Sequence, residues 1–191
     1  MAIQRSRVIG FVLMVLVAPV AVLAQSPAPT ASEQKVLDGF RAKAKDYMDR
    51  EHSLAADKMK PTTDVARLET QRKLLRDAVQ QARIHAKQGD FFGEQTAEVF
   101  RKILADLFHG PDGKKIEASL NHAEPGAPAQ FRVNEEFPNQ NGQPIQSVPP
   151  TVLKALPALP KGLEYCIAGN TLALHDTSAN MVVDYLPNAL P

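Results

Sequence analysis

Metal-binding side chains are scattered along this chain. Its five histidines are His52, His85, His109, His122 and His175. No two of them lie three or four residues apart, the spacing that places two ligands on one helix face. A site assembled by tertiary folding from His85, His109 and Asp90 is an alternative. The sequence itself predicts no metal site and no cofactor.

Nucleophilic motifs are missing as well. The sequence contains no G-x-S-x-G, no H-E-x-x-H and no phosphate-binding glycine loop. Cys166 is the single cysteine, which excludes an internal disulfide and a thiolate zinc site. Cys166 is interpreted as a strand residue, either free or paired with a second chain. We therefore predict no catalytic residues, although an enzyme with an unrecognised site is a third possibility.

The most distinctive internal stretch is Gln88-Gly89-Asp90-Phe91-Phe92. Asp90 could be a ligand or an acid at a corner between helices. The favoured interpretation is structural. Gly89 suits a left-handed helix end, Asp90 a turn or cap, and one of the two phenylalanines would fill the end of a helix bundle.

Residues 1–24 have the pattern of a secretory signal peptide. Arg5 and Arg7 precede an apolar run of about 11 residues, shorter than the roughly 20 needed to span a bilayer. Val22-Leu23-Ala24 is a suitable cleavage site. The prediction is a periplasmic or secreted protein with no stable membrane insertion after cleavage.

The net charge of the chain argues against nucleic acid as a partner. The chain has 22 basic residues, and losing Arg5 and Arg7 leaves 20 against 21 acidic ones. This balance gives no electrostatic support for nucleic-acid binding. The expected partner is an unknown protein or envelope component.

Proline content divides the chain into parts. Residues 32–122 contain two prolines, residues 123–160 contain eight, and residues 161–186 contain none. The predicted organisation is a signal peptide (1–24), a flexible leader (25–31), a helical region (32–122), a Pro-rich connector (123–160), and a β meander with a tail (161–191). Residues 32–191 are expected to form one domain.

Apolar spacing of three and four residues predicts the helices. The first spans about 32–57, with capping-box spacing between Thr30 and Glu33. The second spans about 63–88 and forms an antiparallel hairpin with the first. Glu51 and Arg72 are polar exceptions on the two apolar stripes. Arg83 is expected to tolerate replacement by Asp.

A third helix is predicted over 94–109 and a short fourth over 114–121. Phe131 and Val133 could form a lone strand. Alternating apolar residues then predict a three-stranded antiparallel meander after residue 162, with Gly169-Asn170 as a type II′ turn. One face of the meander needs cover, for which the third helix is the candidate. The predicted fold class is α+β.

Two stretches carry a resemblance: QARIHAKQGDFF, and the segment from LPALPKGLEY through VVDYLPNALP. Together they resemble a group of uncharacterised exported bacterial proteins, and the resemblance implies no activity. A position that is usually basic in that pattern is Cys166 here. The hairpin pattern around Gly169-Asn170 is also similar to the β unit of periplasmic nickel and cobalt homeostasis proteins.

These observations favour a non-catalytic exported protein that acts as a binding or envelope-associated module. The alternative is a periplasmic accessory protein for metal homeostasis or stress sensing. The two differ in whether histidine and carboxylate side chains converge on a common point.

The signal-peptide interpretation predicts that the exported protein begins at Gln25, because cleavage follows Ala24. Amino-terminal sequencing of protein recovered from the periplasm or the medium tests this. Exported protein that begins at Met1 would contradict it.

Overall fold

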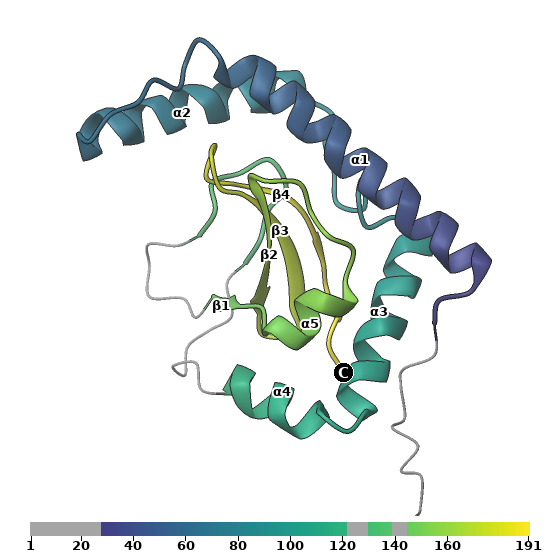
Figure 1. Ribbon diagram of the computed structural model, residues 1–191. Coiled ribbons are helices and arrows are strands. Elements are labelled where there is room, and N and C mark those ends of the chain that lie inside the picture. Colours follow the sequence, from purple (N-terminus) through teal and green to yellow (C-terminus); the bar gives the residue numbers. More distant parts are fainter. Residues whose placement is uncertain (1–27, 122–129, 139–144) are drawn as a thin grey trace, which may run out of the picture.

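A computed structural model describes residues 28–121, 130–138 and 145–191 (Figure 1). The architecture is α+β, as predicted: helices pack against an antiparallel sheet formed by the carboxyl-terminal part of the chain. The predicted signal peptide and His122 lie outside the described residues. No helix within the described ranges is long and apolar enough to cross a membrane.

The first helix, α1 (Ala31–Ala55), begins with the predicted capping box. The Thr30 hydroxyl accepts the Glu33 backbone N–H (3.2 Å), and the Glu33 carboxylate accepts that of Thr30 (2.7 Å). The predicted stripe faces the core, and Glu51 is buried within it together with its apolar neighbours.

The second helix, α2 (Val65–Ala82), forms a hairpin with α1 in which the later part of α2 meets the carboxyl-terminal part of α1 (Figure 1). It ends six residues before the predicted position. A long-range contact caps this helix end. The side-chain amide of Asn134 donates to the carbonyl of Arg83 (3.0 Å) and, more weakly, to that of Gln80 (3.4 Å). These bonds satisfy carbonyls at the helix end, and residues after 85 are left to form the corner that follows.

Two further helices match the predictions closely. They are α3 (Glu94–His109) and α4 (Gly113–Asn121). Figure 1 shows α3 beside the sheet, where it contributes the buried Phe100 and Leu104 to the core.

The predicted meander is present as β2 (Leu163–Ala168), β3 (Thr171–Asp176) and β4 (Met181–Leu186), paired in sequence order. Between β2 and β3, Gly169 has φ +57° whereas Asn170 has no positive φ, as a type II′ turn requires.

The predicted connector has more structure than proline content suggests. It contains β1 (Gln146–Ser147), which adds a fourth strand beside β2, and α5 (Pro150–Ala155). Pro150 suits the start of α5, because the first helical residue needs no N–H donor. Phe131 and Val133 form no strand, and the single β-bridge in that stretch joins Glu136 to Met181.

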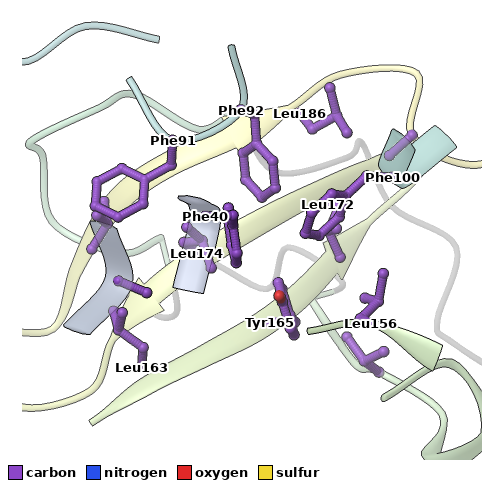
Figure 2. Close-up of a cluster of buried hydrophobic side chains, with 14 of the residues drawn as sticks. Phe40, Phe91, Phe92, Phe100, Leu156, Leu163, Tyr165, Leu172, Leu174 and Leu186 are labelled. Atoms are coloured by element: carbon purple, nitrogen blue, oxygen red, sulfur yellow. The ribbon is translucent and has the colours of Figure 1, made fainter. Parts of the chain in front are cut away.

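Both faces of the sheet are covered, which corrects the prediction of one covered face. The main core lies on the helical side, where Figure 2 shows the rings of Phe40, Phe92 and Phe100 over the strands. The ring centroids of Phe40 and Phe100 are 4.9 Å apart, so α1 contributes to this cover together with α3.

Phe131 and Phe137 cover the opposite face and pack with Ala168, Ala173 and Val182. The half-buried Cys166 belongs to this second cluster, and burial raises the pKa of its thiol to about 12. Its thiol is consequently a poor nucleophile at neutral pH.

Adjacent leucines on α2 test the packing of the hairpin. Leu75 is fully buried and Leu74 is 51% exposed. Leu75→Asp should lower the free energy of unfolding by several kcal/mol, because it buries an unpaired carboxylate. Leu74→Asp should change that free energy by less than about 0.5 kcal/mol. Denaturant melts followed by circular dichroism measure both, and equal effects would contradict this packing.

Candidate functional site

Five polar residues are buried in the described part of the protein: Glu51, Gln71, Asp176, Asn180 and Asp184. The three carboxyl groups among them lie where the helices meet the sheet. Two are held by hydrogen bonds and one is not. This difference separates structural groups from a candidate site.

A β-bulge turns Asp184 toward the helices. Leu174 of β3 pairs with Asp184, but the next residue, His175, pairs with Val182. Val183 is therefore the extra residue of the bulge. Because directly opposed residues share a face of the sheet, the Asp184 side chain points to the core side with Leu174.

Asp184 holds the corner between α2 and α3. Its carboxylate accepts the backbone N–H groups of Gly89 (3.0 Å), Phe91 (2.7 Å) and Phe92 (2.9 Å), and also that of Tyr185 (2.8 Å). Burial raises its pKa, and the four N–H donors oppose that shift. The corner is thus an anion-binding arrangement of backbone N–H groups whose anion is the protein's own side chain.

The favoured interpretation of the Gln88–Phe92 stretch agrees with this geometry. Gly89 has φ +91°, the left-handed conformation that glycine tolerates best. The Asp90 carboxylate accepts the Lys87 backbone N–H (3.0 Å), and both phenylalanines are buried. These residues shape the corner.

Asp176 is held in a similar way. Its Oδ2 accepts the hydroxyl of Tyr47 (2.6 Å), and its Oδ1 accepts the N–H groups of Ser178 and Ala179 (both 2.9 Å). Burial, and then the charge of Asp176, raise the pKa of Tyr47 well above its usual range. The pair ties α1 to the turn between β3 and β4.

Glu51 differs from these two groups. It is 1% exposed, and neither of its carboxyl oxygens has a hydrogen-bond partner. The His52 imidazole lies 3.8 Å from Oε2 and is itself exposed. Burial, and then the nearby Asp176, raise the pKa of Glu51 to about 7. Glu51 is therefore a buried acid that changes charge near neutrality.

Arg83 is part of the same cluster, which corrects the expectation that it is dispensable. Its guanidinium lies over the ring of Tyr47 (5.2 Å to the centroid) and donates to the carbonyl of Val183 (3.0 Å). Burial lowers its pKa. Arg83→Asp would place a carboxylate among Asp176, Asp184 and Asp90, so it should destabilise the fold.

A cavity of about 220 Å³ opens beside this cluster, between α1, the end of α2 and the corner. Its lining includes Glu51, the rings of Tyr47 and Phe91, and the aliphatic side chains of Leu54 and Val79. The remaining lining residues are Lys43, Asp46, Arg50, Ala82, Arg83 and Asp90. These carboxyl, cationic, aromatic and aliphatic groups suit recognition of a small molecule.

The structure does not bring His85, His109 and Asp90 together as a metal site. His85 and His109 are exposed, and Asp90 is bound within the corner. Across residues 28–121, 130–138 and 145–191, no group of three or more His, Cys, Asp or Glu side chains could hold a metal ion. His175 stacks on Phe137 at 3.9 Å between ring centroids, and burial lowers its pKa.

In the sequence, Glu51 is a polar exception on an apolar stripe, with no predicted role. That position was the available signal, because a carboxylate on a core-facing stripe is rarely buried without a partner. The second exception, Arg72, carries no such signal: it is half-buried and pairs with Glu69 (3.0 Å).

Searches of protein-family models, curated proteins and solved structures found no match to this chain.

The pKa of Glu51 predicts how stability depends on pH. Its ordinary value of 4.5 is raised to about 7 in the fold, so folding favours the protonated form. The contribution of Glu51 to stability is fully present below pH 4.5 and is lost as pH rises through 7. Glu51→Gln, which cannot ionise, should have little effect at pH 4.5. At pH 8 it should raise the free energy of unfolding by on the order of 3 kcal/mol.

Glu98→Gln is the matched control, because Glu98 is an exposed glutamate on α3. Urea unfolding of the three proteins between pH 4.5 and 8.5 makes the measurement. A constant difference between Glu51→Gln and the unsubstituted protein across this range would contradict the prediction.

Proposed function

We propose that this protein is an exported, non-catalytic binding module that holds a small molecule in the cavity beside Glu51. The observation that carries the proposal is the buried Glu51 carboxyl group, whose two oxygens have no hydrogen-bond partner. A ligand that donates hydrogen bonds would supply the missing partner.

The cost of this group supports a binding role. A buried carboxyl without a partner destabilises the fold by several kcal/mol when ionised. The neighbouring acids show that this fold supplies partners readily, since Asp176 accepts three hydrogen bonds and Asp184 accepts four. A ligand that binds only the folded state would stabilise that state and so offset this cost.

Export is the second part of the proposal. It is supported by the signal-peptide pattern of residues 1–24 and by the resemblance to exported bacterial proteins. An exported binding module would meet its ligand, and any envelope partner, outside the cytoplasm.

Blocking the cavity tests the proposal. Ala82 is exposed and lines the cavity, so Ala82→Trp should fill the cavity without disturbing the core. Each protein is purified from the periplasm and denatured, and the released small molecules are identified by mass spectrometry. We expect a molecule in stoichiometric amount from the unsubstituted protein, and at least tenfold less from Ala82→Trp.

Ala66→Trp provides the matched control, because Ala66 is exposed at the opposite end of α2 and does not line the cavity. It should retain the ligand. Equal amounts from all three proteins, or no released molecule from any of them, would contradict the proposed function.

A further inference from the structure

We infer that the ligand of the cavity is a small organic cation, with a primary ammonium or guanidinium group that donates hydrogen bonds to Glu51. This inference rests on the proposed function and names the chemical class of the ligand. It follows from which polar groups of the cavity are already satisfied and which are not.

The cationic groups of the cavity already have partners or face water. Arg83 donates to the carbonyl of Val183 (3.0 Å) and lies over the Tyr47 ring. Lys43 donates to the carbonyl of Asp90 (3.0 Å), and Arg50 is exposed. The cationic side chains of the cavity therefore leave no buried donor that needs an anionic partner.

The acidic side chains of the cavity differ from the cationic ones, because one of them lacks hydrogen-bond partners. The Asp90 carboxylate accepts the Lys87 N–H, and Asp46 is exposed to water. Glu51 is the lining residue whose buried acceptors are unfilled. An anionic ligand here would face both Glu51 and the nearby Asp176, whereas an ammonium group would be attracted by both.

Size and lining favour an organic cation over a metal ion. A cavity of about 220 Å³ is smaller than the roughly 300–1,000 Å³ of drug-sized sites, which suits a ligand of a few heavy atoms. Leu54, Val79 and the rings of Tyr47 and Phe91 can pack against its alkyl part. Calcium would need six to eight oxygen ligands, and among the described residues no group of three His, Cys, Asp or Glu side chains could hold a metal ion.

Access to Glu51 is from the outer end of the cavity. Asp46 and Arg50 line the cavity and are exposed, so a ligand enters past surface side chains. The Glu51 oxygens themselves are out of contact with solvent. Because a water-sized group does not touch these oxygens, the Glu51 side chain must turn into the cavity for an ammonium group to meet its carboxylate. The ammonium group then exchanges its hydration for a charge-assisted hydrogen bond.

Binding of a cation is linked to a proton. Glu51 must ionise to bind an ammonium group, so its proton is released to solvent as the ligand binds. The charged and titratable groups around it are Lys43, Asp46, Tyr47, Arg50 and His52 of α1, Arg83 after α2, Asp90 of the corner, and Asp176 of β3. With a pKa of about 7, the ionised fraction of Glu51 rises roughly 25-fold between pH 5.5 and 7.5.

Isothermal titration with n-butylammonium tests the inference, on exported protein that has been freed of any bound molecule by urea unfolding, dialysis and refolding. We expect the dissociation constant to fall about 25-fold from pH 5.5 to 7.5 and to level off above pH 8. Glu51→Gln should weaken binding at pH 7.5 by more than tenfold, and Glu98→Gln should leave it unchanged. Circular dichroism checks that each variant is folded.

Three further probes complete the test at pH 7.5: butyrate, n-butanol and calcium chloride. Tighter binding of butyrate or butanol than of n-butylammonium would overturn the inference. So would calcium binding that depends on Glu51 and exceeds that of the amine. If n-butylammonium fails to bind but the extraction experiment still finds a molecule that Ala82→Trp excludes, the proposed function stands and the cationic ligand class is wrong.

Discussion

The structure depends on the four backbone N–H groups that bind the carboxylate of Asp184. Three of them belong to the corner between α2 and α3, so one side chain of β4 joins the helical hairpin, the third helix and the sheet. The corner has few alternative partners for these donors, because its flanking phenylalanines are buried. Without the carboxylate, three N–H groups would lose their acceptor, at about 1–3 kcal/mol each where they are buried.

A second connection, from Tyr47 to Asp176, fixes α1 over the end of β3, two residues along that strand from Leu174, the partner of Asp184. Together the two carboxylates hold the hairpin at two points. The cavity lies beside both, and Arg83 bridges them by stacking on Tyr47 and donating to the carbonyl of Val183, next to Asp184. The walls of the candidate site are consequently rigid elements, which is the arrangement that favours selective binding.

Glu51 lies near Asp176 and lacks the hydrogen-bond partners that the two aspartates have. Its cost to stability grows as it ionises, while its attraction for a cation grows over the same pH range. A ligand that neutralises it would stabilise the protein most strongly under the conditions that otherwise weaken it. The same residue therefore couples pH, stability and binding.

Local patterns in the sequence determined the capping box of α1, the limits of α3, the three-stranded meander and the position of Glu51 on a buried stripe. Each of these depends on a period of 3.6 or 2 residues, or on neighbours within a turn. Only the tertiary structure decided where α2 ends, that Phe131 and Phe137 cover the second face of the sheet, and that a bulge turns Asp184 toward a corner more than 90 residues earlier in the chain. Those outcomes arise from contacts between distant segments, and no local period records which distant partner a side chain will meet.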